Sequence, residues 1–180
     1  MTFIQLILAF SSQSVISNAN GPQRSVTFLG SLVDDDELNV TRGSRNFDAR
    51  RSRWIVTVFD IQEQPLTEFY LERAAERNIQ CLAGALYLQP NEYSEAEQPE
   101  ITTYVWLPSS AFDSIWNFAP TIQPTRLQLT LKLAAPFQGS ALNYSPGDPD
   151  GYDKIWSAED ENPLLFESAE FRFSPISRTN

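Results

Sequence analysis

Four leucines alternate with polar residues over Leu127–Leu133. Successive side chains of a strand point to opposite faces of a sheet, so the alternation predicts a strand over Thr125–Ala134 with one face in the core. The segment Leu165–Phe173 alternates in the same way. Near the N-terminus, Thr2–Ser11 contains an apolar run that only Gln5 interrupts, and we interpret it as a first strand.

Four more segments complete the predicted sheet structure. Trp54–Ile61 is apolar on both faces, which is typical of a central strand covered on both sides. Further strands are expected over Ser25–Val33, Ile79–Leu88 and Ile101–Leu107.

Two short helices are predicted between these strands. Leu66–Arg77 is rich in good helix formers and follows Pro65, which marks a helix entry. Ser109–Phe118 follows a proline as well and places apolar residues on one helical face. About seven strands and two short helices predict a single mainly-β domain over residues 1–180. The fold is either a β-sandwich or a partly closed barrel, because both share these local signals.

The overall charge narrows the expected partners. The chain has 180 residues and a formal net charge of −10. Such a charge repels a phosphate backbone, which argues against general nucleic-acid binding, and it also favours solubility. No stretch of about 18 apolar residues is present, so we expect no transmembrane helix and no membrane partner.

A single cysteine, Cys81, excludes an intramolecular disulfide and favours a cytoplasmic location. Cys81 lies within an apolar run that also contains Ile79, Ala83 and Ala85, so we expect a buried structural thiol rather than a nucleophile. Secretion is the alternative if residues 1–19 act as a signal sequence. No Lys or Arg precedes their apolar run, which a secretory signal normally has.

The chain contains no histidine. This excludes the Ser-His-Asp and Cys-His triads, histidine-based zinc sites and the common proton shuttle near neutral pH. Glycine-rich phosphate-binding motifs are also absent from the sequence. These exclusions favour a non-catalytic protein.

Arginines are concentrated in one predicted loop, Asp34–Arg53. The cluster consists of Arg42, Arg45, Arg50, Arg51 and Arg53. Guanidinium groups make planar, two-point contacts with carboxylates or phosphates, so the cluster is a candidate binding surface for an anionic group. The alternative is that the arginines neutralise the acidic run Asp34–Glu37, which itself could dock onto a basic partner.

A second predicted loop, Gln138–Asp153, contains a run of aspartates and glycines. Its candidate calcium ligands are Asp148, Asp150 and Asp153, because calcium prefers carboxylate and carbonyl oxygens from a tight loop. The same residue types also form ordinary turns. Calcium is therefore the one cofactor that the sequence suggests, and a turn without metal is the alternative.

Aromatic residues lie in or beside this second loop. Tyr144, Tyr152 and Trp156 are candidates for a partner surface or for stacking on a sugar, and otherwise they cap the open end of the fold.

Together these patterns predict a non-catalytic binding module that engages a protein partner through the segments Asp34–Arg53 and Gln138–Trp156. An inhibitor or immunity-type protein and an assembly component are two forms of this function. One alternative is a carbohydrate-binding domain, with or without calcium. Another is a carboxylate-based hydrolase, for which two acids must face each other across a pocket. The acids available to it are Asp60, Glu68, Glu72 and Glu76.

Overall fold

The computed structural model describes residues 3–33, 39–42, 45–48, 53–89, 100–121, 125–134, 155–157 and 163–175. For residues 39–42, 45–48, 88–89, 125–126, 155–157 and 174–175 it describes the backbone only.

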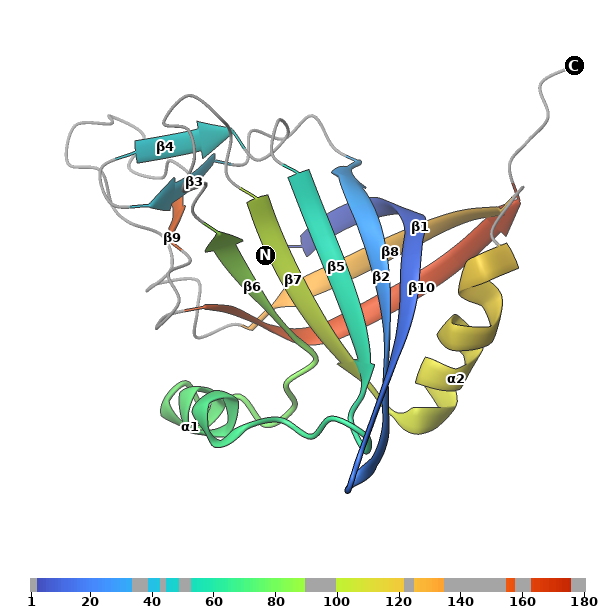
Figure 1. The fold of residues 1–180 in the computed structure, drawn as a ribbon. Helices are drawn as coiled ribbons and strands as arrows, with labels where there is room; N and C mark the ends of the chain where they lie inside the picture. Colours follow the sequence, from blue (N-terminus) through green and yellow to red (C-terminus); the bar gives the residue numbers. More distant parts are fainter. Residues whose placement is uncertain are drawn as a thin grey trace, which may run out of the picture.

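Seven strands form one mixed sheet that closes in a ring, in the order β1–β2–β5–β7–β6–β10–β8 (Figure 1). The strands are β1 (Phe3–Asn18), β2 (Gly21–Leu32), β5 (Arg53–Asp60), β6 (Gly84–Gln89), β7 (Glu100–Leu107), β8 (Thr125–Leu133) and β10 (Leu164–Pro175). A second sheet has the order β4–β3–β9. Its strands are β3 (Asn39–Arg42), β4 (Arg45–Asp48) and β9 (Ile155–Ser157).

Strand direction in the ring follows from the number of strands. Antiparallel neighbours alternate in direction, and an odd number of strands cannot alternate all the way round a closed ring. At least one neighbouring pair must therefore be parallel. That pair is β5 and β7, while every other neighbouring pair of the ring is antiparallel. The connection between β5 and β7 is correspondingly long and contains helix α1 (Glu68–Glu76) and β6.

The main core fills the interior of the ring. The alternating leucines of β8 all face inward and are at most 5% exposed. Phe28, Trp54 and Phe166 are the largest strand side chains buried with them. Full burial of a large apolar side chain stabilises the fold by about 1.5–3 kcal/mol, so this interior supplies most of the driving force for folding.

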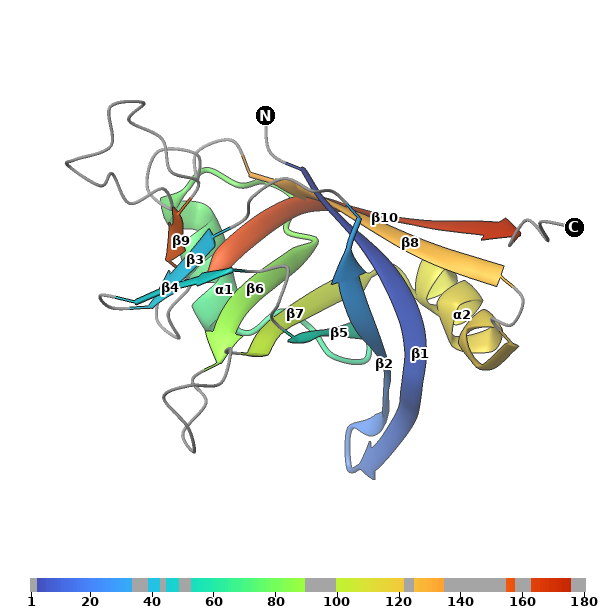
Figure 2. The same cartoon turned by 90° about the horizontal axis from the view of Figure 1, so that it is seen from above.

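Helix α2 (Ser109–Phe118) begins directly after Pro108 and is followed by a short 3₁₀ turn, Ala119–Thr121. Figure 2 shows it between the β1–β2 hairpin and the ends of β8 and β10. Its buried face carries Phe112 and Ile115. The helix thereby closes the core where the two strand pairs diverge.

Helix α1 contacts the outer face of β6 and β7 through Tyr70. Tyr70 packs its ring edge against Trp106, with centroids 4.8 Å apart, and its hydroxyl accepts a hydrogen bond of 2.7 Å from Tyr87. Tyr87 and Trp106 are each only 7% exposed, although both lie outside the ring. These aromatic rings extend the hydrophobic core to the outer face of the sheet.

The predicted fold class is confirmed: the domain is mainly β, with seven main strands and two helices. The strands belong to one closed sheet rather than to two separate sheets, because β1 pairs with β8. Helix α2 has the predicted boundaries, and α1 is slightly shorter than predicted. In the part of the chain that the structure describes, no helix is long and apolar enough to cross a membrane.

One predicted strand is partly wrong. The strand expected over Ile79–Leu88 begins only at Gly84, and residues 79–83 form an extended connection after α1. Cys81 lies in this connection and is exposed, so the expectation of a buried thiol is also wrong. Within the connection, Leu82 is 8% exposed and Ile79 packs half-buried against the core, so the apolar residues on either side of Cys81 are buried more than Cys81 itself.

Candidate functional site

The two segments predicted to form a binding surface meet in the small sheet. Residues 39–41 of β3 pair in parallel with residues 155–157 of β9, so Val40 lies opposite Trp156. Strand β4 adds to the other side of β3 and places Arg42 opposite Arg45 in a hairpin. Backbone pairing thus joins segments that lie more than a hundred positions apart in the chain.

The structure does not describe most of the predicted site residues. Arg50, Arg51, Tyr144, Tyr152 and the three candidate calcium ligands Asp148, Asp150 and Asp153 lie outside the described residues. In the described part of the chain, no group of three or more Cys, Asp or Glu side chains could hold a metal ion.

Arg53 is the predicted arginine whose side chain is described. It begins β5, is exposed, and lies opposite Glu100 across the parallel pair. Trp54 points into the ring, so Arg53 points outward on the same face as Ile55.

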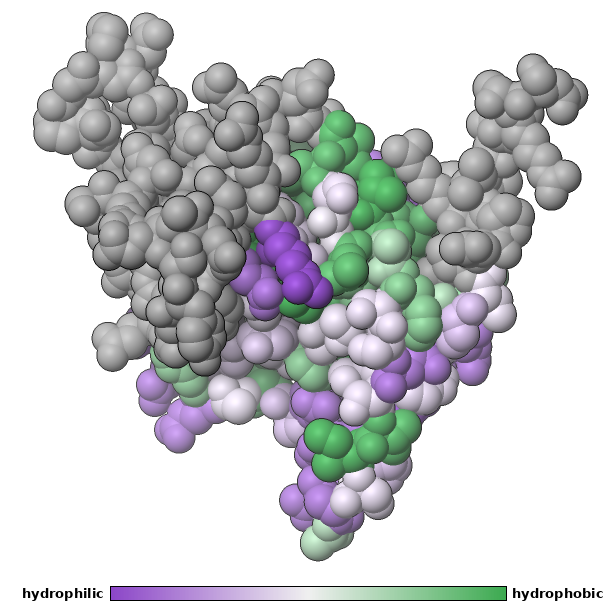
Figure 3. Space-filling model, turned by 45° about the horizontal axis from the view of Figure 1, so that its top comes forward, coloured by the Kyte–Doolittle hydropathy of each residue, from purple (hydrophilic) through white to green (hydrophobic). Residues whose placement is uncertain are grey.

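Apolar side chains continue across the outer face from this point. Ile55 lies opposite Leu29 of β2, and Leu29 lies opposite Ala9 of β1. Leu29 is 38% exposed, and Val33, directly after β2, is 39% exposed. We define Ala9, Leu29, Val33 and Ile55 as the outer apolar face. Figure 3 shows hydrophobic residues gathered on this side of the molecule. Alternation along each strand determines which residues lie on this face, but no motif or unusual composition distinguishes them from other outward-facing residues.

Carboxylates converge on Arg24 of β2, which the sequence analysis did not identify. Arg24 Nη2 lies 2.6 Å from Glu63 Oε2, 2.9 Å from Asp113 Oδ1 and 3.7 Å from Asp60 Oδ2. The guanidinium also lies over the rings of Phe112 and Trp116, about 5 Å from each centroid.

Asp60 is the most buried acid of this cluster and is only 2% exposed. Its Oδ1 accepts hydrogen bonds from Gln62 N at 2.9 Å and from Ser109 Oγ at 2.8 Å. Burial by itself raises the pKa of Asp60, but these hydrogen bonds and the nearby Arg24 charge outweigh it, so the net pKa is lowered. The cluster therefore joins β2, the end of β5 and α2 through ionised groups.

The other acids considered for hydrolysis do not converge. Glu68, Glu72 and Glu76 are exposed on α1, and Glu76 pairs with Arg73 at 2.9 Å. This is the arrangement of a solvated helix face.

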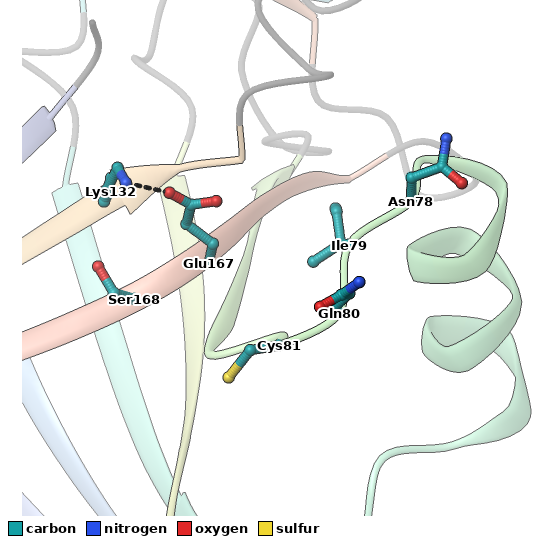
Figure 4. A pocket seen from close by; sticks show the side chains of 7 residues that line it. All are labelled: Asn78, Ile79, Gln80, Cys81, Lys132, Glu167 and Ser168. Atoms are coloured by element: carbon teal, nitrogen blue, oxygen red, sulfur yellow. Dashed lines mark ion pairs between the residues drawn. The ribbon is translucent and has the colours of Figure 1, made fainter.

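A groove of about 380 Å³ lies between the connection after α1 and strands β8 and β10 (Figure 4). Asn78 adopts a left-handed φ of 55° just after α1, and Ile79, Gln80 and Cys81 continue the lining towards β10. Glu167 lies at a register irregularity of β10 and forms an ion pair with Lys132. Since these two charged residues pair with each other, the part of the lining that the structure describes carries no net charge.

No protein-family model, no curated protein and no solved structure matches this chain.

Proposed function

We propose that this chain is a non-catalytic binding module for a protein partner. Its contact surface is formed by the segments Asp34–Arg53 and Gln138–Trp156, extended by the outer apolar face next to Arg53. The observation that carries the proposal is the parallel pairing of β3 with β9, which joins the two segments with the most unusual composition. Loops supported by a rigid sheet are the usual location of binding residues.

The outer apolar face supports a protein as the partner. Leu29 and Ile55 offer apolar area next to an exposed guanidinium, that of Arg53. Protein interfaces combine an apolar centre with a polar rim and are enriched in arginine. A partner with an apolar centre and carboxylates at its rim would complement this surface.

The carboxylates of the described residues support a role without catalysis. Asp60, Glu63 and Asp113 all contact Arg24, and Arg24 also packs against α2. Their contacts explain how the helix is attached to the sheet. A hydrolase would instead need two acids that face a substrate pocket.

The test is affinity capture from a lysate of the source organism, followed by mass spectrometry. The bait is the wild-type chain, and two surface variants are compared with it: Arg53→Glu and Leu29→Ser. Two variants elsewhere on the surface serve as matched controls. Arg172→Glu changes an arginine whose side chain is 68% exposed, and Leu71→Ser changes a leucine that is 54% exposed.

We expect one stoichiometric protein in the wild-type capture. Its recovery should fall about tenfold or more with Arg53→Glu and with Leu29→Ser, because a residue at the centre of an interface contributes about 1.4 kcal/mol or more, which corresponds to a tenfold change in affinity. Both controls should retain it. The proposal fails if no protein is captured, or if the surface variants and controls capture it equally.

A further inference from the structure

Strand β1 extends well beyond one of its neighbours. It pairs with β2 as far as Asn18, but its pairing with β8 ends at Leu8. Among the described residues, no strand pairs with the β8 side of β1 beyond that point. Figures 1 and 2 both show the β1–β2 hairpin projecting beyond the body of the molecule.

Helix α2 contacts only the first part of this edge. Gln13 is half-buried, and its Nε2 donates a hydrogen bond of 2.5 Å to the carbonyl oxygen of Trp116. Every residue of Ser14–Asn18 is exposed. Val15 and Ile16 are among the most exposed large apolar residues of the described chain, at 55% and 59%. We call Ser14–Asn18 the open edge.

The opposite side of the hairpin is protected. β2 pairs with β5 only from Ser25 onward, so its residues before Ser25 also lie beyond their neighbour. However, Pro22 has no N–H group, and the Arg24 N–H donates to Glu63 Oε1 at 3.0 Å. Proline and charged side chains are the devices by which proteins protect exposed strand edges.

The open edge has none of these devices. β1 contains no proline and no charged residue, and the first charged side chain in the sequence is that of Arg24. In a protein of net charge −10, this makes the hairpin tip a place where two copies approach without placing like charges in contact. A bulge between Phe10 and Ser12 bends β1 before the open edge begins, and the edge itself continues in register with β2.

We propose that the open edge pairs antiparallel with the open edge of a second copy of this chain, forming a symmetric dimer. A two-fold axis perpendicular to the joined hairpins would place Ile16, the central residue of the open edge, opposite its own counterpart. Each Val15 would then lie opposite Ser17 of the other copy, and the two Val15 residues would be diagonal neighbours. The main-chain N–H and C=O groups of the edge would then be paired, and the exposed Val15 side chains would lie on one face of the joined sheet. This inference concerns a different surface from the proposed function and stands independently of it.

The charge distribution also predicts how salt acts on the dimer. The two copies repel each other through their net charge, while the contact itself contains no ion pair. Added salt screens the repulsion and weakens no attraction, so association should strengthen with ionic strength. The opposite dependence is typical of a contact between oppositely charged surfaces. A contact of about five residues per strand is small, so the dimer should be weak and concentration-dependent.

Sedimentation equilibrium over a wide concentration range tests the proposal with three samples: Val15→Lys, Val15→Glu, and an equimolar mixture of the two. Each substitution enters the symmetric contact twice, so each variant alone should dimerise about tenfold more weakly than the wild type. The mixture should regain dimers, because a lysine then lies near a glutamate. Leu71→Lys and Leu71→Glu are the controls, since Leu71 is as exposed as Val15 but lies on α1.

Circular dichroism melts verify that the variants fold. If Val15→Lys does not fold, Ser17→Lys provides the same test, because residues 15 and 17 lie on the same face of β1. A wild-type chain that stays monomeric at all concentrations overturns the proposal, even if its open edge binds a strand from another protein. Equal weakening of dimerisation by the Leu71 variants would also overturn the proposal. A mixture of Val15→Lys and Val15→Glu that fails to associate would overturn it as well. Loss of partner capture by Arg53→Glu leaves this result unaffected, so the two proposals fail separately.

Discussion

Arg24 and Glu63 form a two-point ion pair that also fixes the backbone of β2. Arg24 Nη2 lies 2.6 Å from Glu63 Oε2, and Arg24 Nε lies 3.0 Å from each carboxylate oxygen. The same carboxylate accepts the Arg24 backbone N–H. The side chains are only 24% and 18% exposed, so solvent screens this pair less than a surface pair. The arginine thereby attaches α2 and the turn after β5 to one strand.

Arg24→Met should destabilise the domain by about 2–4 kcal/mol, because it leaves the buried Asp60 carboxylate without its cation. Glu63→Gln should cost less, about 1–2 kcal/mol, since two other carboxylates still contact Arg24. Urea unfolding measures both values. Arg172→Met is the control, because its pair with Glu170 is exposed and should change stability by less than about 0.5 kcal/mol. Equal effects of Arg24→Met and Arg172→Met would contradict the structural role of the cluster.

Asp60 should make part of the stability sensitive to acid. Its pKa is lower in the folded protein than the ordinary value of 3.8, so its contribution is fully present above that pH. The contribution is lost as the pH falls from 3.8 through the folded pKa. Asp60→Asn removes the titrating group, so the stability difference between wild type and variant should shrink over this range. Thermal melts at a series of pH values measure the difference, and a difference that is constant with pH would refute the expectation.

Tyr70 should produce the opposite dependence at alkaline pH. Burial raises its pKa above the ordinary value of 10.0; the hydrogen bond from Tyr87 opposes the shift, and Tyr104 adds to it. A raised pKa gives stability that is fully present below pH 10 and is lost as the pH rises through the folded pKa. Tyr70→Phe should cost about 1 kcal/mol at neutral pH, because Tyr87 loses this acceptor, and it should show a smaller alkaline loss. Identical alkaline melting curves for the two proteins would argue against it.

Gly84 is required by a close approach of two backbones. A Cβ atom at this position would lie 2.8 Å from the carbonyl oxygen of Tyr104. We expect Gly84→Ala to destabilise the domain by about 1–3 kcal/mol, since the strand backbone must shift. Gly30→Ala is a matched control, because its Cβ would meet only side-chain atoms, the nearest being Trp54 Cβ at 3.3 Å. Chemical denaturation of both variants should rank Gly84→Ala as the more destabilised, and the reverse order would contradict the geometry.

Local patterns predicted the elements that a local pattern defines. Strand β8 was identified from alternating leucines, all of which face the core, and α2 from a proline followed by an apolar helical face. The predicted first strand ended at Ser11, whereas β1 continues to Asn18. The last residues of β1 pair with β2 alone and are exposed. They cover no core, so their sequence does not alternate between apolar and polar residues and gives no sign of a strand.

The candidate site was predictable only in part. Composition identified the two segments that β3 and β9 join, but no local signal indicates that their backbones pair. Arg24 was missed for the same reason: its partners Glu63 and Asp113 lie 39 and 89 positions away. Asp60 was noticed at a strand end, yet its hydrogen bond from Ser109 depends on the docking of α2. Contacts of this kind become visible only once the ring has closed.

Closure of the sheet also determines where it is easiest to open. Every strand of a closed ring has two neighbours, so the ring has no edge strand that can detach on its own. Opening the ring must separate two neighbouring strands, each of which is also paired with another strand on its other side. β10 pairs with β8 from Phe166 to Pro175 but with β6 only from Leu164 to Phe166. The short pairing between β6 and β10 is therefore the place where the ring should open first, and local unfolding should start there. Its amide protons should exchange with solvent before those of the β8–β10 ladder.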